Sequence, residues 1–351
     1  MTLKFVISIL SSFLVSWVFT PIVRDFFINK GWVENPADKQ RKTKNATALT
    51  SVPRGGGIPI FFGIFFSTLL FLPSDKHLIF ILLASFLTLT IGVVDDIKDI
   101  SPKVRLLTNT LAALIVVSSG IGIAYISNPF GGVLDLSTVR INFEFFGPHS
   151  IWVISDLLAV LWIVWCMNSV GWAAGIEGQL PGFVSISAIF IGILGLKYST
   201  DATQWPVIIL AGSVAGAYLG FLPHNFFPQS IMPGYSGKSL AGLLLAILSI
   251  LSGAKLATLI FLLGIPMLDG LYVLIKRVIH RRSIFLSDGT HLHHQLLRLG
   301  WSRQKIAVFY WLISFLLGII SLFLNSQQKI YFFISLAFLF FGFVIQLSRR
   351  I

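Results

Sequence analysis

Charged residues are scarce in this sequence, and cysteine is almost missing. Only 11% of the 351 residues are charged and 55% are hydrophobic, whereas a soluble domain has about 25% charged residues. Several apolar runs are long enough to cross a bilayer. The composition therefore argues against a soluble domain and predicts an integral membrane protein. The single cysteine, Cys166, excludes an intrachain disulfide, and its place inside an apolar run is typical of a small buried hydrophobic side chain.

The apolar runs predict an all-α fold, a polytopic transmembrane bundle of about eleven helices in a single domain that covers residues 1–351. Helices and closed barrels are the structures that satisfy backbone polar groups in lipid, and these runs lack the alternating pattern of barrel strands. The expected spans are residues 3–23, 57–73, 77–94, 105–126, 153–172, 182–198, 204–222, 239–253, 256–275, 304–324 and 330–347.

Lysine and arginine are rare in one of the two sets of connecting loops. Most of the 26 basic residues lie in residues 24–56, 95–105 and 276–305, at Lys238 and in the C-terminal tail. By the positive-inside rule these loops face the cytoplasm of a plasma-membrane protein whose N-terminus is outside. The net charge of +12 then suits anionic headgroups or an anionic substrate rather than nucleic acid. The other face holds only Lys4, Lys76, Arg140, Lys197, Lys255 and Lys329.

An acidic pair is the first of four polar clusters on the basic face. Asp95 and Asp96 stand where a predicted span meets water, and Lys103 and Arg105 follow closely. Adjacent carboxylates supply the hard oxygen ligands that Mg²⁺ prefers, and this ion often bridges substrate phosphates. Mn²⁺ is an alternative with the same ligand preference. An ordinary helix end with solvated charges is the competing interpretation.

Two glycine-rich connections form the second and third clusters. One runs from Asn168 through Glu177, and the other contains Asn225 and ends at Lys238. Glycine lets a backbone approach a ligand closely, and a glycine-serine turn that opens a helix can hold an anion. The spacing does not match a Walker A loop. Flexible connections between spans are the competing interpretation.

Three histidines within four residues form the fourth cluster. His291, His293 and His294 follow Asp288 and the pair Arg281–Arg282. Such a group can bind phosphate or stabilise developing negative charge. Zinc binding is the main alternative from residue type alone, and a solvated juxtamembrane loop is the other.

In their order along the chain, these motifs resemble those of the polyprenyl-phosphate N-acetylhexosamine-1-phosphate transferase superfamily, a glycosyltransferase family 4-like group. The resemblance covers nearly the whole chain. The His-x-His-His form looks more like the branch of undecaprenyl-phosphate GlcNAc-1-phosphate transferases than the muramoyl-pentapeptide branch. The other segments that carry the resemblance are Val52-Pro53-Arg54-Gly55-Gly56-Gly57, Asp95-Asp96, Asn168, Gly175-Ile176-Glu177-Gly178, Asn225 with Pro228, and Gly264-Ile265-Pro266-Met267-Leu268-Asp269.

The resemblance implies an enzyme that transfers a sugar-1-phosphate from a UDP-sugar to polyprenyl phosphate and releases UMP. Magnesium would bridge the diphosphate, the active site would face the cytoplasm, and a homodimer is compatible with this function. The implied metal ligands are Asp95 and Asp96. The implied catalytic residues are Asp95, Asp96 and His293. The implied substrate-binding residues are Arg54, Lys103, Arg105, Asn168, Glu177, Asn225, Lys238, His291 and His294.

The sequence departs from the family pattern in two motifs. Gly171, Ala174 and Glu177 stand where the family has an asparagine and two aspartates, and Tyr235 falls in the segment where it has another aspartate. Asp95 and Asp96 are then expected to supply more of the metal's coordination than in relatives. A catalytically silent relative that binds lipid phosphate or scaffolds a glycan assembly complex is the alternative function.

A secondary transporter is a third interpretation, which the charge pattern disfavours. Transporters place polar residues near the bilayer midplane, but here only Asp269 lies noticeably inside a span. Because catalysis needs reacting groups held together, we expect the four clusters to meet in one cleft. The residues expected there are Asp95, Asp96, Asn168, Glu177, Asn225 and His293.

Overall fold

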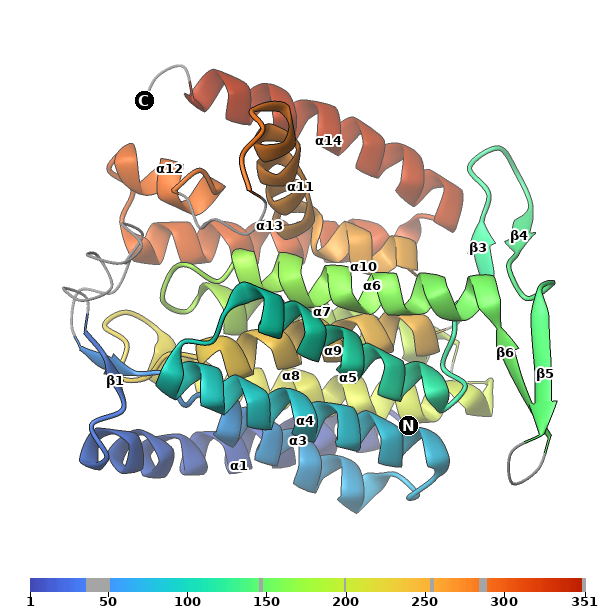
Figure 1. Cartoon of the computed structure of the whole chain (residues 1–351), viewed down its shortest axis with the longest axis horizontal. Coiled ribbons are helices and arrows are strands. Elements are labelled where there is room, and N and C mark those ends of the chain that lie inside the picture. The colour runs from blue at the N-terminus through green and yellow to red at the C-terminus, as the bar shows by residue number, and fades with distance from the viewer. Residues whose placement is uncertain (36–50, 145–147, 199, 253–255, 284–288, 349–351) are drawn as a thin grey trace.

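The chain folds into one bundle of long helices (Figure 1). The structure is a computed structural model that describes residues 1–35, 51–144, 148–198, 200–252, 256–283 and 289–348. The long helices are α1 (Thr2–Asn29), α3 (Gly57–Phe71), α4 (Lys76–Lys98), α5 (Pro102–Ser118), α6 (Val153–Trp172), α7 (Gln179–Lys197), α8 (Trp205–Asn225), α9 (Gly234–Leu251), α13 (Arg303–Phe323) and α14 (Ser326–Ser348).

Shorter elements complete the fold. They are the helices α10 (Leu256–Leu262), α11 (Gly264–Ile279) and α12 (Leu292–Arg298), the 3₁₀ turn η1 (Ala202–Gln204), and the strands β1 (Val33–Glu34), β2 (Val52–Pro53), β3 (Tyr125–Ser127), β4 (Val133–Asp135), β5 (Arg140–Glu144) and β6 (Pro148–Trp152). The strands pair in three antiparallel ribbons, β1–β2, β3–β4 and β5–β6.

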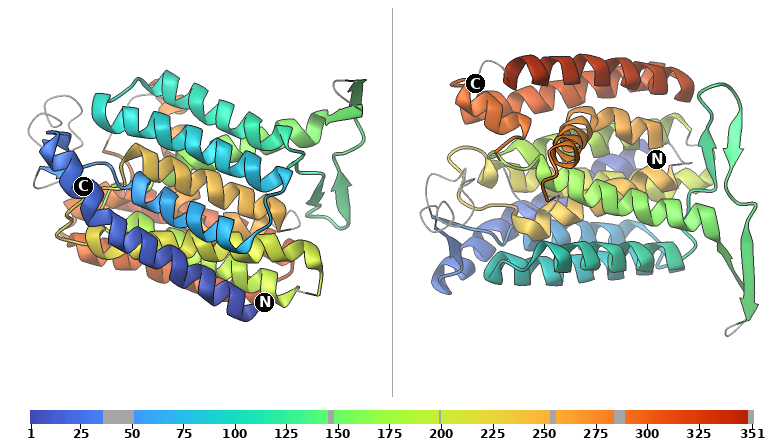
Figure 2. Two further views of the ribbon diagram at one scale, coloured as in Figure 1. Left: turned by 90° about the horizontal axis from the view of Figure 1, so that it is seen from below. Right: turned by 45° about the horizontal axis from the view of Figure 1, so that its top comes forward.

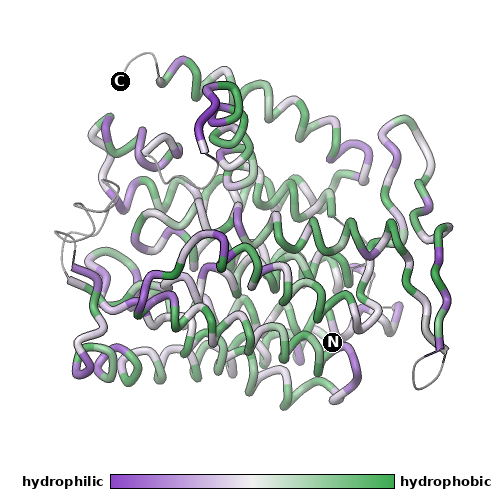
Figure 3. Tube along the Cα trace, in the orientation of Figure 1, coloured by the Kyte–Doolittle hydropathy of each residue, from purple (hydrophilic) through white to green (hydrophobic). Residues whose placement is uncertain are grey.

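The prediction of an all-α polytopic membrane bundle is confirmed. Among the described residues, eight helices are long and apolar enough to cross a membrane alone, and the bent pair α10–α11 brings the number to as many as nine. Each predicted span contains a helix. Figure 3 shows the apolar middles of these helices in green and most of the polar positions at their ends.

Two predicted spans differ from the structure. The span 105–126 ends early, because α5 stops at Ser118 and Gly120 adopts a left-handed conformation with φ of 99°, which ends helices readily. The span 256–275 is broken, since α10 and α11 meet at an angle of 84°. Pro266 lies in the first turn of α11, where proline is tolerated at the start of a helix but interrupts the hydrogen bonds of a continuous one.

Small residues let α1 and α8 pack closely. Packing and hydrogen bonds, rather than a hydrophobic force, drive helix association in lipid, and interfaces are rich in small residues. Ser12 of α1 donates a hydrogen bond from Oγ to the carbonyl oxygen of Ser213 at 2.6 Å. A side chain at Gly216 or Gly220 would run into the α1 backbone at Ile9 or Phe13.

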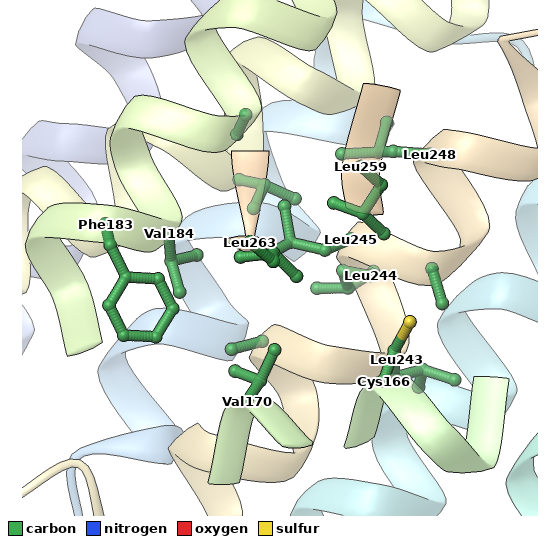
Figure 4. Close-up of a cluster of buried hydrophobic side chains, with 14 of the residues drawn as sticks. Cys166, Val170, Phe183, Val184, Leu243, Leu244, Leu245, Leu248, Leu259 and Leu263 are labelled. Atoms are coloured by element: carbon green, nitrogen blue, oxygen red, sulfur yellow. The ribbon is translucent and has the colours of Figure 1, made fainter. Parts of the chain in front are cut away.

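The apolar core lies around α9, which is buried almost throughout. Figure 4 shows side chains of α9, such as Leu244, packing with Phe183 of α7, Cys166 of α6 and Leu259 of α10. Cys166 is a buried free thiol, as expected from its apolar surroundings. Because α9 is surrounded by other helices, its first turn is a fixed point around which polar side chains can be arranged.

The connections with the predicted site residues gather at one end of the bundle. In Figure 1 the end of α4, β1 and α12 lie at the left, and the ribbons β3–β4 and β5–β6 lie at the right. This grouping agrees with the predicted alternation of the loops. The basic residues that fall in 36–50 and 349–351, together with Lys255 and Asp288, lie outside the described residues.

We expect Gly216→Ala to destabilise the bundle. The added Cβ would meet the carbonyl oxygen of Ile9, and overpacking costs about 1–3 kcal/mol, while the gain in helix propensity is at most about 1 kcal/mol. Gly342→Ala in α14 is the matched control, because nothing lies within 4 Å of its added carbon. Midpoints of thermal unfolding in detergent compare the two variants. A Gly216→Ala midpoint at or above that of the unaltered chain contradicts the close packing of α1 and α8.

Candidate active site

Asp96 holds the beginning of α9. Its Oδ1 accepts a hydrogen bond from the backbone N–H of Tyr235 at 2.6 Å, and its Oδ2 accepts from Oγ and N–H of Ser236 at 2.6 and 3.3 Å. A carboxylate at a helix N-terminus satisfies free N–H groups and interacts favourably with the helix dipole. Both oxygens of Asp96 are therefore engaged in fixing α9.

The glycines around this contact allow it to form. A side chain on Gly57 or Gly92 would overlap Ser236, and one on Gly234 would overlap Asp96. Gly234 also has a φ of 66°, a conformation that glycine adopts without strain. The glycine run before α3 thus serves close packing of α3 and α4 against the first turn of α9.

Asp95 is fully buried between two arginines. Its Oδ1 accepts hydrogen bonds from Nε of Arg105 at 2.6 Å and from the backbone N–H of Ile100 at 3.2 Å. Nη2 of Arg54 lies 3.6 Å from Asp95 Oδ2, yet this buried oxygen has no hydrogen-bond partner among the described residues. Asp95 Oδ2 is thus a buried carboxylate oxygen that faces Arg54 without a hydrogen bond, and such an atom needs an explanation.

The two arginines come from segments on either side of the acidic pair. Nε of Arg54 lies 3.4 Å from Glu34 Oε2 and 3.5 Å from Asp96 Oδ1, because the β1–β2 ribbon brings Glu34 opposite Val52. Arg105 follows the short turn after α4 and also pairs with Asp99 at 2.7 Å.

Tyr235 closes one side of this cluster. Its hydroxyl donates to Oδ1 of the buried Asn109 at 3.0 Å, and the guanidinium of Arg105 lies 5.0 Å from the centre of its ring. Sequence reasoning treated Tyr235 only as a missing carboxylate. In the structure it joins α9 to α5 and orients Arg105, a role for which the sequence gives no clear signal.

Asp269 anchors the histidine motif. Its Oδ1 accepts from the backbone N–H of Leu292 at 2.8 Å, and its Oδ2 lies 2.8 Å from Nδ1 of His291. Asp269 was singled out as the carboxylate inside a predicted span, and such residues are often functional. The structure makes it the residue that ties α11 to the start of α12.

His293 is buried against the glycine-rich connection after α6. Its ring would overlap a side chain at Gly175, and it lies between the rings of His291 and His294, with centroids 5.8 and 4.3 Å away. Burial, and then the nearby His294, His291 and Lys238, lower the pKa of His293 well below its ordinary value. Its Nδ1 is a buried polar atom that has no hydrogen-bond partner among the described residues.

Lys238 links the two halves of the site. It lies two residues after Ser236 on α9, and its charge reaches His293. The acidic pair contacts the first turn of α9 directly, and one turn of helix rises only about 5.4 Å. The start of α9 thus connects Asp96 with Lys238, and the charge of Lys238 acts on His293. That Asp95, Asp96, Asn168, Glu177, Asn225 and His293 line one cleft stays a prediction.

Glu177 and Asn225 fix loops rather than face an open site. Nη1 of Arg303 donates to both oxygens of Glu177 at 2.9 Å. Asn225 accepts from the N–H of Gly178 at 3.0 Å and donates to the carbonyl oxygen of Ile231 at 3.0 Å. Arg303 entered the sequence analysis only as one basic residue of a loop, so its pairing with Glu177 was missed.

The other predicted residues lie at the edges of the site. Asn168 donates to the carbonyl oxygen of Val164 in its own helix at 2.7 Å, and Lys103 is exposed at the start of α5.

Among the described residues, no group of three or more His, Cys, Asp or Glu side chains could hold a metal. The zinc interpretation of the histidines therefore has no support in this part of the chain.

These features define a polytopic membrane protein with a charged, partly buried site where its helices end. The sequence profile of glycosyl transferase family 4 matches residues 78–253, and the chain belongs to that family. It is 29% identical over 333 residues to the probable undecaprenyl-phosphate N-acetylglucosaminyl 1-phosphate transferase of Bacillus subtilis (strain 168), covering 92% of this chain and 86% of the relative.

Two other similar proteins have related names. The decaprenyl-phosphate N-acetylglucosaminephosphotransferase of Mycobacterium leprae (strain TN) is 26% identical over 294 residues, which cover 75% of this chain and 71% of the relative. The phospho-N-acetylmuramoyl-pentapeptide-transferase of Bacillus cytotoxicus is 26% identical over 325 residues, which cover 90% and 95%. The family resemblance found in the motifs is thereby confirmed.

We expect the Glu177–Arg303 pair to be strongly coupled. Removing one partner of a buried ion pair leaves an uncompensated charge and costs about 3–5 kcal/mol. Glu177→Gln and Arg303→Met should each lower the midpoint of thermal unfolding, and the double variant should lose less than the sum of the two. Arg298→Met, which alters an exposed arginine on α12, is the control. Additive losses would show that the pair does not hold the loop.

We also expect His293 to make stability depend on pH. Its pKa is lowered in the folded state, so the unfolded chain binds its proton first and stability falls as the pH drops below about 6.5. His293→Asn should flatten the decrease in unfolding midpoint between about pH 7.5 and 5.5. His280→Asn, at an exposed histidine after α11, should leave the decrease unchanged. An unaltered pH profile in His293→Asn contradicts the neutral, buried imidazole.

Proposed function

We propose that this chain transfers a sugar-1-phosphate, most simply an N-acetylhexosamine-1-phosphate, from a UDP-sugar to a polyprenyl phosphate, with release of UMP. The observation that carries this proposal is the buried Asp95 carboxylate between Arg54 and Arg105, where the helices end. Its Oδ2 lies in ion-pair distance of Arg54 but has no hydrogen-bond partner among the described residues. Relatives over most of the chain are named as polyprenyl-phosphate sugar-phosphate transferases. Cell-wall or surface-glycan biosynthesis is the pathway class that such a product serves.

The arrangement suits phosphoryl transfer by positioning and charge. In this reaction an oxygen of the lipid phosphate attacks the β-phosphorus of the UDP-sugar, and UMP leaves. The second pKa of a phosphate monoester is about 6, so the nucleophile is largely ionised and needs no strong base. Arg54 and Arg105 can orient the phosphates, and Lys238 can offset charge on the side of the histidines.

His293 can respond to the arriving phosphate. The imidazole is neutral before binding, because burial and neighbouring cations lower its pKa. An anionic phosphate beside its free Nδ1 raises the pKa of the ring and favours a charged hydrogen-bond donor. Asp269 keeps His291 and the start of α12 in place while this happens. His293 thus acts as a phosphate-binding and proton-holding group in the proposed reaction.

Magnesium is the cofactor that the resemblance implies, and Asp95 is the residue that fits it. Asp96 has both oxygens on α9, and Asp95 Oδ1 accepts from Arg105, which leaves Asp95 Oδ2. Proteins do hold Mg²⁺ through one or two carboxylates together with substrate phosphates, and Mn²⁺ prefers similar ligands. When bound, the ion stabilises negative charge on the diphosphate as a Lewis acid. We therefore propose Asp95, rather than Asp96, as the metal ligand.

The membrane side of the site follows from charge. Among the described residues, basic side chains are concentrated in the connections at the site end of the bundle, and by the positive-inside rule this supports a cytoplasmic site. There it meets soluble nucleotide sugar on one side and the lipid phosphate on the other. The homodimer named as compatible with the sequence stays a prediction.

A catalytically silent relative is the second candidate function. Tyr235 stands in the segment where the family has an aspartate, and its hydroxyl is bonded to Asn109 rather than left free for a ligand. Such a protein would bind polyprenyl phosphate without transferring a sugar. A transfer assay with purified protein, polyprenyl phosphate and a panel of UDP-sugars, with magnesium or with a chelator, separates the two functions by UMP release.

We expect Asp95→Asn to abolish transfer while the protein stays folded. Loss of one preorganised charged group costs about 100-fold or more in rate. The amide oxygen of asparagine can still accept from Arg105 and Ile100, and the ion pair with Arg54 is the contact that is lost. Asp99→Asn is the matched control, since the exposed Asp99 contacts the same arginine. UMP release is measured for both variants at equal amounts of folded protein. Full activity of Asp95→Asn contradicts the proposed role.

Asp96→Asn is a less selective variant. The sequence analysis gives Asp96 a role in catalysis, but the structure shows it capping α9. An amide places a donor against the N–H groups of Tyr235 and Ser236 and loses the charge that the helix N-terminus favours. Loss of activity in this variant therefore combines loss of chemistry with loss of local structure, and Asp95 gives the cleaner test.

A further inference from the structure

The ribbon β5–β6 lies at the opposite end of the bundle from the candidate active site. All five residues of β5, Arg140–Glu144, are exposed, and the two strands form a sheet of their own. In Figures 1 and 2 the ribbons at this end run across the helices rather than along them. A two-stranded ribbon is marginally stable by itself in water, so its exposed side chains call for a partner.

One face of this ribbon is apolar and the other is polar. Side chains alternate along a strand, and residues directly opposite each other share a face. Ile141 is opposite Ile151 and shares its face with Phe143, which is opposite His149, so this face holds three apolar positions and one histidine. Asn142 is opposite Ser150 on the other face. The side chains of Ile141, Phe143 and Ile151 are 56, 43 and 44% exposed. The protein itself therefore leaves this apolar face largely uncovered.

The ribbon begins where the membrane surface must lie. α6 has 20 residues and is therefore about 30 Å long, which equals the thickness of the hydrocarbon core. β6 runs directly into α6, and the N–H of Val153 donates to the carbonyl oxygen of Val139 at 3.0 Å. The ribbon is thus fixed at the boundary between hydrocarbon and headgroups.

The apolar face continues the lipid-facing surface of α6. Ile151 of the ribbon is followed by exposed apolar residues at helical spacing along α6. Those residues are Ile154, Leu157 and Leu161.

The polar face carries groups suited to a hydrated interface. The guanidinium of Arg140 lies 4.4 Å from the ring centre of Trp152, and tryptophan is enriched at the level of the headgroups. Each strand also has an edge that pairs with no other strand among the described residues. Such backbone groups need water and cannot enter hydrocarbon. These features keep the ribbon on the membrane surface rather than inside it.

We propose that β5–β6 is a membrane-surface anchor, an amphipathic ribbon whose apolar face rests on the lipid leaflet at the end of the bundle away from the active site. Its partner is the lipid surface, with Ile141, Phe143 and Ile151 facing the acyl chains. Asn142 and Ser150 face water. This role is independent of the chemistry at the other end of the helices.

Spin labels on the two faces test the proposal. Cys166 is the only cysteine, so a Cys166→Ala background accepts single labels at Phe143→Cys and at its neighbour Asn142→Cys. The full chain is placed in vesicles of phosphatidylethanolamine and phosphatidylglycerol. Collision rates of each label with lipid-soluble oxygen and with a water-soluble nickel chelate are then measured. Ile151→Cys and Ser150→Cys repeat the comparison on the other strand.

We expect a several-fold higher oxygen-to-nickel ratio for labels on Phe143→Cys and Ile151→Cys than for those on Asn142→Cys and Ser150→Cys. Equal ratios on both faces would overturn the proposal, because the ribbon would then stand in water. Labels on the apolar face that are shielded from both reagents would overturn it as well, since a protein surface would cover that face instead of lipid.

Discussion

The hydrogen bonds from the first turn of α9 to Asp96 organise the polar end of this protein. They join a buried carboxylate of α4 to the N–H groups of Tyr235 and Ser236, and they can form because the glycines at positions 57, 92 and 234 have no side chain that would overlap Ser236 or Asp96. Everything that distinguishes the site is attached to this turn. Tyr235 orients Arg105 on one side, and Lys238 reaches His293 on the other.

A membrane bundle has few ways to hold such a turn. Lipid supplies no hydrogen bonds, so the polar groups that build the site are gathered where the helices end. The close packing of α1 and α8 shows the same constraint in its simplest form, since Ser12 bonds directly to the backbone at Ser213. The break at Leu263 serves the site in a different way. It turns α11 by 84° relative to α10. Asp269 on α11 then forms hydrogen bonds with Nδ1 of His291 and the backbone N–H of Leu292.

The sequence predicts structure or function correctly where a residue pattern is compatible with only one physical role. Apolar runs predicted the helices, because only helices explain them in lipid, and the acidic pair and histidines were recognised from the chemistry they can perform. It was less informative where the outcome depends on partners distant in the chain. No residue near Glu177 in the sequence predicts its ion pair with Arg303, which lies 126 residues later. From the sequence alone, Tyr235 is interpreted only as the loss of a carboxylate that could bind a metal. The structure shows its contacts with Asn109 and Arg105. The ribbons after α5 were missed because an apolar run that ends in β-branched residues resembles the end of a span.

The charges of the site explain why a tyrosine can stand in place of a carboxylate. Asp95, Asp96 and Glu34 surround Arg54, and Arg105 is shared between Asp95 and Asp99, so the four carboxylates already outnumber the two arginines. A further buried carboxylate would need another cation to offset its desolvation. A phenol adds no charge, fills the space beside Arg105 and keeps the guanidinium in position by contact with its ring. Tyr235 therefore spares this buried cluster a further negative charge. Through the start of α9 it also ties Asn109 and Arg105 to the turn that Asp96 holds.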